Sequence, residues 1–304
     1  MLPDSRLNDW AASRRAILAS RYWISPVGRR PRWHHRFFSF LLAVFGQALR
    51  LTPLFARGRR NALDLELTRL EISLPGLPAS FDGYRILHVS DSHLDILPPV
   101  ADAAERLLGD IEVDLLALTG DVHGWPEHPI EQSVGLLARA LKGVRVRDRL
   151  AVLGNHDPVE MVAALQGLGF ETLVNRSVTL DRNGQSIRIT GLDDVHSFYS
   201  PAARAALEPG DGFQVALVHS AEMADHAADA GYGLYLCGHT HGGQICLPGR
   251  RPVFTQLVRC RHGASGLWRE GKMVGYTTPG LGVSPPTLRF NSRGGAALIT
   301  LRCG

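Results

Sequence analysis

The sequence is poor in cysteine. Its 304 residues include four, and no CxxC pair occurs among Cys237, Cys246, Cys260 and Cys303. This pattern predicts no disulfide framework, because such frameworks need regularly paired cysteines. It fits a reducing, cytoplasmic setting.

Acidic residues are scarce at the start of the chain. Residues 1–60 contain twelve arginines against Asp4 and Asp9, a balance of +10, whereas the rest of the chain has 21 basic and 27 acidic residues, a balance of −6. The acidic main part argues against nucleic acid as a partner. The basic segment instead predicts a local anionic partner, such as a phospholipid surface.

The sequence also offers no apolar run in this segment that is long enough to cross a membrane. The stretch FFSFLLAVFGQAL (37–49) has thirteen residues without a charge, whereas a spanning helix needs about 20. On a helix, a small or polar stripe faces an apolar one. The polar stripe is Ser39, Ala43, Gly46, Gln47 and Arg50, and the apolar one is Phe37, Phe38, Leu41, Leu42, Phe45 and Leu49.

Two interpretations of this helix stay open. Flanking arginines and Trp33 favour a helix lying in the plane of a membrane surface, so that residues 1–60 form an anchor on the inner face of the membrane. The alternative is a hydrophobic helix packed on the protein itself. A third hypothesis is export, because SRRAIL (13–18) is similar to a twin-arginine signal, but the charged residues that follow argue against it.

The rest of the chain alternates short apolar runs with helical stretches. Five of the runs end in polar residues: 84–93, 113–121, 149–157, 214–220 and 232–241. The stretches between them that we expect to be helical are 98–109, 130–141, 158–168 and 221–230. We also expect an edge strand over 65–78 and two closing strands over 273–280 and 296–303. This order predicts a layered α/β fold with a site at the C-terminal ends of strands.

Eight polar side chains follow the five runs. They are Asp91, His93, Asp121, Asn155, His156, His219, His239 and His241. Carboxylate and imidazole are the ligands that Mn, Fe or Zn prefer in enzymes. Eight such groups are too many for one ion and suit two ions bridged by a carboxylate, about 3.5–4 Å apart. In HDPVE (156–160) we expect Asp157 to cap the next helix.

The motifs resemble those of the calcineurin-like metallophosphoesterases over about residues 80–242. They are DSH (91–93), GD (120–121), GNHD (154–157), His219 and GHTH (238–241). This resemblance implies a layered β-sandwich flanked by helices (α/β/β/α) and a catalytic domain over residues 61–304. Three further stretches, SFDGYRILHVSDSH, GHTHGGQI and GLGVSPPTLRFN, look like a subgroup of bacterial phosphodiesterases that includes a UDP-2,3-diacylglucosamine pyrophosphatase of lipid A synthesis.

The resemblance also implies a role for each residue. Two divalent ions (Mn, Fe or Zn) would be bound, the first by Asp91, His93 and His241 and the second by Asn155, His219 and His239. Asp121 would bridge them, and a bridging hydroxide would attack a phosphodiester or pyrophosphate bond. His156 would bind no metal, and would instead stabilise the developing charge or protonate the leaving oxygen.

Several assignments stay open on sequence alone. His88 is expected in the core, His123 in a structural role, and His196 and the arginines of residues 250–261 in loops that could reach the site. The function alternatives are a nuclease, a general phosphomonoesterase, or a metal-binding module without catalysis. Because every proposed ligand lies beyond residue 90, we expect residues 1–60 to be dispensable for hydrolysis of a small soluble diester.

Overall fold

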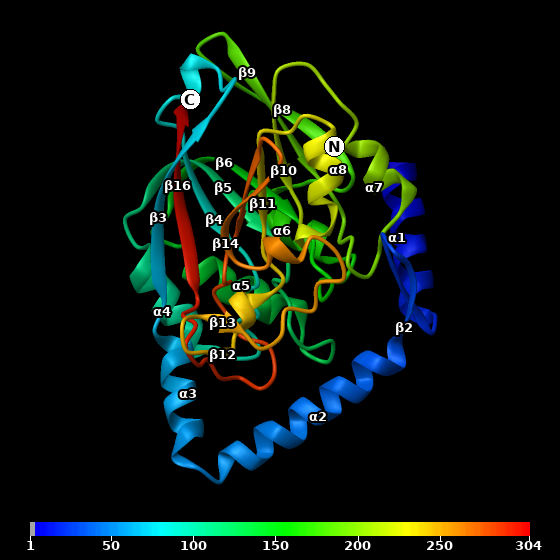
Figure 1. The fold of residues 1–304 in the computed structure, drawn as a ribbon, viewed down its shortest axis with the longest axis vertical. Coiled ribbons are helices and arrows are strands. Elements are labelled where there is room, and N and C mark those ends of the chain that lie inside the picture. The colour runs from blue at the N-terminus through cyan, green and yellow to red at the C-terminus, as the bar shows by residue number, and fades with distance from the viewer. Residues whose placement is uncertain (1–3) are drawn as a thin grey trace.

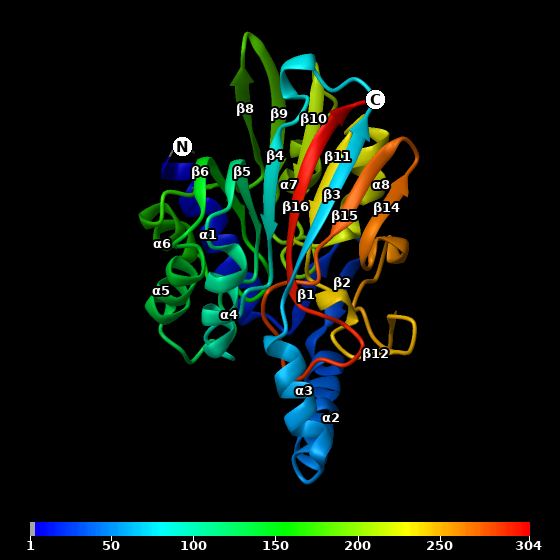
Figure 2. The same ribbon diagram turned by 90° about the vertical axis from the view of Figure 1, so that its left-hand side faces the viewer.

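Two six-stranded sheets packed face to face form the centre of the protein (Figures 1 and 2). The computed structural model describes residues 4–304, except for the side chains of residues 4, 5, 34–36 and 38. The predicted position of Phe38 on the apolar stripe therefore lies outside the described residues. In spatial order, the first sheet is β3 (Glu66–Leu74), β16 (Gly295–Cys303), β4 (Arg85–Val89), β5 (Glu112–Thr119), β6 (Arg145–Val152) and β7 (Glu171–Thr172). The second is β14 (Gly266–Glu270), β15 (Met273–Thr277), β11 (Leu234–Cys237), β10 (Phe213–Leu217), β9 (Gln185–Gly191) and β8 (Arg176–Arg182).

Helices cover the outer face of each sheet. Beside the first sheet lie α4 (Pro99–Leu108), α5 (Ile130–Ala140) and α6 (Met161–Gly167). Beside the second lie α7 (Pro201–Ala206), η2 (Ala221–Met223) and α8 (Ala224–Asp229). Three apolar clusters fill the spaces between these four layers, and the middle one joins the two sheets. The expected α/β/β/α sandwich is confirmed.

The order of the strands brings the polar residues to one edge. β4, β5, β6 and β7 run parallel, as do β9, β10, β11 and β15. Because parallel strands end on the same side of a sheet, the loops after β4, β5 and β6 lie together, and so do those after β10 and β11. β3 is at an edge of the first sheet, as expected.

One expected helix start is wrong. α6 begins at Met161, not at Pro158, and its cap position, Glu160, makes no side-chain cap. The Asp157 carboxylate instead accepts backbone N–H groups of residues 121, 122, 123 and 154. The Asp157 carboxylate therefore binds four backbone N–H groups from two loops in place of the N–H groups at the start of the helix.

The N-terminal segment wraps around one side of the sandwich. It consists of α1 (Asp4–Ala19), the hairpin of β1 (Tyr22–Ser25) and β2 (Gly28–Pro31), α2 (Arg32–Arg50) and α3 (Pro53–Leu63). α2 and α3 form a V that projects beyond the body in both views (Figures 1 and 2). The remaining short elements are η1 (Ala79–Phe81), η3 (His241–Gly243), β12 (Cys246–Leu247), β13 (Arg251–Pro252) and η4 (Arg261–Gly263).

Candidate metal centre

Five loops meet at the C-terminal edge of the sandwich and hold all eight polar residues. Five of these residues have left-handed backbone, with φ between 36° and 72°: Asp91, His93, Asp121, His239 and His241. Such angles are uncommon for residues other than glycine and are tolerated where the surrounding structure enforces them. The side chains are therefore aimed by the loops, and not by the alternation of a strand.

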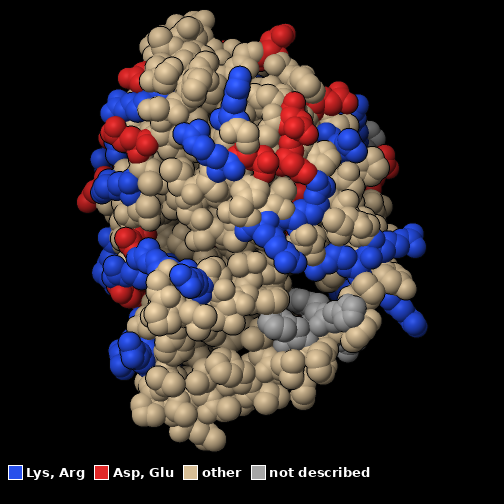
Figure 3. All heavy atoms as spheres, viewed as in Figure 1, with Lys and Arg blue, Asp and Glu red and all other residues tan. Residues whose placement is uncertain are grey.

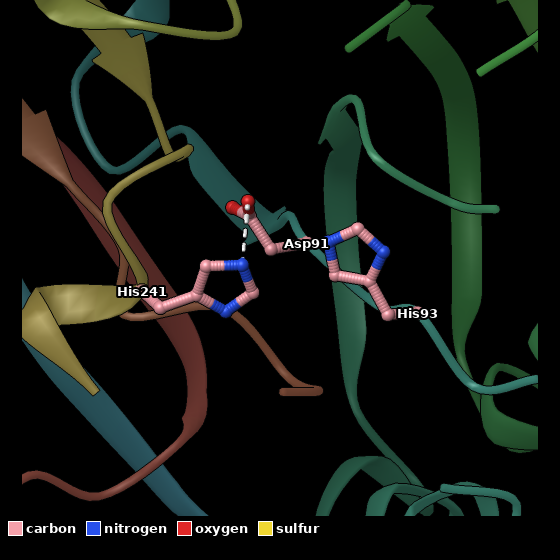
Figure 4. Close-up of side chains that lie close together, drawn as sticks. All are labelled: Asp91, His93 and His241. Atoms are coloured by element: carbon pink, nitrogen blue, oxygen red, sulfur yellow. Dashed lines mark ion pairs between the residues drawn. The ribbon is translucent and has the colours of Figure 1, made fainter. Parts of the chain in front are cut away.

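The first group of ligand atoms comes from the loops after β4 and β11. Asp91, His93 and His241 are buried, and their ligand atoms all lie within 4.8 Å of one another. The three side chains point toward one another, with Asp91 Oδ1 3.6 Å from His241 Nε2 (Figure 4). The rings of His93 and His241 stack at a centroid distance of 5.2 Å.

The second group comes from the loops after β5, β10 and β11. Asp121, His219 and His239 are buried, and their ligand atoms also lie within 4.8 Å of one another. His239 Nδ1 is 3.1 Å from His219 Nε2. His239 and His241, two residues apart, thus belong to different groups.

Asp121 reaches both groups. Its Oδ2 atom is 3.4 Å from His93 Nε2 in the first group and 3.3 Å from His219 Nε2 in the second. Its Oδ1 atom accepts the backbone N–H of His156 at 2.9 Å, which holds the carboxylate in place. This is the position that a bridging ligand requires.

Backbone carbonyls set the proton positions of two of the histidines. His93 Nδ1 is 2.9 Å from the His123 carbonyl oxygen, and His219 Nδ1 is 2.8 Å from the Thr119 carbonyl oxygen. A carbonyl can only accept, so Nδ1 carries the proton in each ring and the neutral ring presents a lone pair at Nε2. Metal-binding histidines are oriented by such carbonyl contacts.

Atoms without partners show that the site fits a cation. Among the described residues, His93 Nε2, Asn155 Oδ1 and His239 Nε2 are buried and have no hydrogen-bond partner. An unsatisfied buried acceptor costs about 1–3 kcal/mol. Two of these atoms, His93 Nε2 and Asn155 Oδ1, are lone-pair acceptors, and a divalent ion would satisfy both.

The pKa shifts agree with a site for positive charge. Burial lowers the pKa of His239 and His241 well below the usual value, so both rings are neutral and able to bind a metal. Burial also opposes a proton on His93 and His219, yet the Asp121 carboxylate outweighs it and raises the pKa of both. The buried carboxylates thus favour a cation between these rings, whether a proton or a metal ion.

His156 and Asn155 lie where the site opens to solvent. A cavity of about 1110 Å³ has both residues in its wall. His156 Nδ1 is 3.2 Å from the Gly124 carbonyl oxygen, and the ring lies edge-on to His93 at 5.1 Å. His156 is placed beside the ligand groups and outside both of them, whereas Asn155 presents its Oδ1 atom.

Arg289 supports the site and was not identified from the sequence. Its fully buried guanidinium donates to the carbonyl oxygens of His241 (2.9 Å), Pro279 (2.7 Å) and Gly282 (2.8 Å). These contacts join the loop of residues 279–282 to the His241 loop, and the backbone N–H groups of Leu281 and Gly282 donate to the carbonyl oxygens of Ser90 and Asp91. A Cβ atom on Gly282 would lie 2.0 Å from the Ser92 carbonyl oxygen, so only glycine fits there. The stretch GLGVSPPTLRFN is thereby explained as a support of the first ligand group.

The N-terminal segment also contacts the site loops. Arg14 is buried and paired with Asp193, and its Nη2 atom donates to the carbonyl oxygens of Gly154 (2.6 Å) and Asp157 (2.7 Å). In α3, the Gly58 carbonyl oxygen accepts the backbone N–H of Arg289 at 3.0 Å. The structure therefore argues against the expectation that residues 1–60 are dispensable for hydrolysis.

The histidines left open by the sequence have defined places. His88 is buried in β4 with Nε2 2.8 Å from Thr119 Oγ1, and burial lowers its pKa to about 3, as expected for a core residue. His123 lines the cavity and is held by Ser133 Oγ at 2.9 Å. His196 also lines the cavity. Of the loop arginines, Arg261 lines the cavity, whereas Arg259 pairs with Asp225.

Fold and ligand geometry together define a metal-dependent phosphoester hydrolase with two neighbouring candidate metal positions. The family model of the calcineurin-like phosphoesterases matches residues 84–243. The chain belongs to this family, whose members normally bind two divalent metal ions.

Relatives that match most of the chain are named as metallophosphoesterases or as a phosphodiesterase. The uncharacterized metallophosphoesterase YkuE of Bacillus subtilis is 30% identical over 78% of this chain and 86% of its own length. The phosphodiesterase YaeI of Escherichia coli is 26% identical over 72% of this chain and 82% of its own. A zebrafish (Danio rerio) transmembrane protein with metallophosphoesterase domain is 27% identical over 77% of this chain and 56% of its own.

Proposed function

We propose that the protein hydrolyses a phosphodiester or pyrophosphate bond in a lipid-linked substrate at an anionic membrane surface. UDP-2,3-diacylglucosamine is one substrate of this kind. The observation that carries the proposal is the mixed character of the cavity beside Asn155 and His156. The name of the relative YaeI, a phosphodiesterase, supports the same reaction class.

One part of the cavity wall is apolar. It is formed by the hairpin, the start of α5 and the loop after β13: Trp23, Ile130, Pro252, Val253, Phe254 and Leu257. Val253 is 61% and Phe254 44% exposed. Exposed apolar side chains beside a polar reaction site suit a substrate with an apolar portion next to its phosphate.

In the proposed hydrolysis, the bound ions and the side chains of the protein would have different roles. Bound Mn, Fe or Zn would supply a water of lowered pKa and neutralise the phosphoryl oxygens. Asp121, Asn155 and the histidine ligands would orient the phosphoryl group through the ions. His156 is neutral in the free protein, because burial lowers its pKa. An anionic phosphoryl group beside the ring would favour its protonated form, which donates to the leaving oxygen.

The surface of α2 favours attachment to a membrane. Its apolar side chains are exposed, including Phe37 (59%), Phe40 (63%), Leu41 (47%) and Val44 (52%), whereas Gly46 is buried against Pro286. On the face seen in Figure 3, no described Lys, Arg, Asp or Glu side chain is visible at the lowest tip of the projection, and Lys and Arg gather above that tip. Exposed apolar side chains with arginines nearby suit the interface of an anionic bilayer.

Helix length sets a limit on this attachment. Within residues 4–304, no single helix has the length and hydropathy to cross a membrane; residues 39–50 and 53–63, bent by 110°, meet the criterion only as a pair. We therefore propose that α2 lies in the membrane surface. A relative is named as a transmembrane protein with a metallophosphoesterase domain, which is consistent with action beside a bilayer.

Hydrolysis assays test the proposal. The metal-free protein is loaded with Mn, Fe or Zn and given bis(p-nitrophenyl) phosphate, p-nitrophenyl phosphate and UDP-2,3-diacylglucosamine. We expect hydrolysis of the diester and of the UDP-lipid to exceed that of the monoester. Preference for the monoester would favour a general phosphomonoesterase, and no hydrolysis with any metal would favour a metal-binding module.

A further inference from the structure

The cavity wall carries positively charged side chains in addition to the two groups of candidate metal ligands. Four arginines line it, three of them from the N-terminal hairpin and the start of α2: Arg29, Arg30, Arg32 and Arg261. Asp157 is the single acidic residue among the described lining residues, and its carboxylate is occupied by backbone N–H groups. This cavity therefore suits a substrate with several negative charges.

Arg30 is the arginine of this set that contacts His196, a neighbour of the second ligand group. Its half-buried guanidinium places Nη1 3.2 Å from His196 Nε2, and His196 Nδ1 lies 3.1 Å from Glu222 Oε2. If the His196 ring donates to the carboxylate through Nδ1, Nε2 accepts from Arg30, so the three groups form a chain that orients the guanidinium. No carboxylate within 4 Å pairs directly with Arg30 in the described part of the chain.

One imidazole ring, that of His196, contacts both Arg30 and the second ligand group. The ring of His196 lies against that of His239, with centroids 4.3 Å apart. The guanidinium thus contacts a ring that packs against a residue of the second ligand group, beside which a phosphoryl group would be bound. It is positioned for a neighbouring anionic group of the same substrate.

We infer that Arg30 binds a second phosphate of the substrate, so that the N-terminal hairpin selects a pyrophosphate over a simple diester. The inference rests on the proposed function and narrows its substrate class. Guanidinium groups suit this role because their fork of N–H donors matches phosphate oxygens, and such charge-assisted hydrogen bonds are stronger than neutral ones. The hairpin belongs to the basic N-terminal segment, which thereby takes part in substrate recognition.

Binding of inorganic pyrophosphate and inorganic phosphate tests the inference. Calorimetry is carried out on the metal-loaded full-length protein and on Arg30→Gln, Arg30→Lys and Arg21→Gln. Arg21 is an exposed arginine just before β1 that does not line the cavity, so it serves as the matched control. We expect Arg30→Gln to weaken pyrophosphate binding about 10–100-fold, the range for a hydrogen bond to a charged group. Phosphate binding should change less than about threefold.

The other variants and the metal content complete the test. Arg30→Lys should recover part of the pyrophosphate affinity, and Arg21→Gln should bind both anions as the wild type does. Chelation of metal by pyrophosphate is the same for all variants, and metal content is measured for each. Equal loss of affinity for both anions, or no loss for either, in Arg30→Gln with normal metal content would overturn the inference.

The inference and the proposed function fail in different ways. Selective loss of pyrophosphate affinity in Arg30→Gln supports the anion site even if the wild type hydrolyses no ester, a result that would defeat only the proposed function. Normal ester hydrolysis together with unchanged pyrophosphate affinity in Arg30→Gln would defeat only the inference.

Discussion

Arg14 Nη2 donates a hydrogen bond to the carbonyl oxygen of Gly154 at 2.6 Å, across 140 positions of sequence. Gly154 directly precedes Asn155 and His156, the two candidate site residues that line the cavity. α1 is therefore a support of the loop that carries them. The basic N-terminal segment contributes this contact in addition to the hairpin arginines and the exposed face of α2.

Replacing Arg14 tests that support. Arg14→Ala should lower the free energy of unfolding by about 3–5 kcal/mol, because it leaves the buried Asp193 carboxylate without its ion-pair partner, although Trp10 Nε1 still donates to it. Arg15→Ala is the control: its ion pair with Glu160 is exposed, and such pairs contribute about 0–1 kcal/mol. Urea unfolding of both variants measures the difference. Similar losses for the two variants would show that the Arg14 contacts do not stabilise the fold.

Removing the shared carboxylate should affect both candidate metal positions. In Asp121→Asn, the charge between His93 and His219 is lost, so we expect metal content to fall to less than half and diester hydrolysis to fall with it. Asp181→Asn, at an exposed position of β8, should retain both. Elemental analysis of dialysed protein is the measurement. Normal metal content in Asp121→Asn would show that the carboxylate does not bridge.

His156 should matter for the rate and not for the metal. His156→Ala is expected to reduce the rate of hydrolysis by about 10²–10⁴, the range for a positioned proton donor or acceptor. Metal content should stay near that of the wild type, because the ring lies outside both ligand groups. Loss of metal together with activity would identify His156 as a ligand.

The close approach of Gly282 to the Asp91 loop predicts a specific sensitivity. Gly282→Ala should destabilise the protein by about 1–3 kcal/mol, the cost of overpacking, and lower its metal content by shifting Asp91. Gly135→Ala, in the exposed middle of α5 with open space around it, should be neutral or stabilise by up to about 1 kcal/mol. Thermal unfolding and elemental analysis compare the two. A tolerated alanine at 282 would contradict the proposed packing.

The exposed face of α2 predicts binding to anionic vesicles. Full-length protein should sediment with phosphatidylglycerol vesicles and be released by salt, since each basic residue near such a surface contributes about 1 kcal/mol that salt screens. The double variant Leu41→Glu, Val44→Glu should stay in the supernatant. Leu267→Glu, which places the same charge on an exposed leucine of β14, should still sediment. If the α2 variant sediments like the wild type, α2 is not the attachment surface.

Local pattern was sufficient for much of the fold and for the identity of the candidate ligands. Strands such as β5, which contains the apolar run of residues 115–118, were predictable as buried parallel strands, and the polar residues that follow them were predictable as candidate ligands. The helix over residues 37–49 was also predictable, because its two-faced pattern repeats with the helical period. These features depend on neighbours in sequence, so the sequence alone determined them.

Contacts between distant residues were decided by the tertiary structure alone. Asp157 carries a helix-cap pattern, yet the fold surrounds its carboxylate with N–H groups of the loops after β5 and β6. In the sequence, Arg14 and Arg30 are two of the twelve arginines of a basic segment, and nothing distinguishes them from the others. Only the folded chain places Arg14 beside Gly154 and Arg30 beside His196. The physical reason is that a guanidinium or carboxylate can be satisfied by many partners, and which of them is within reach depends on how the whole chain packs.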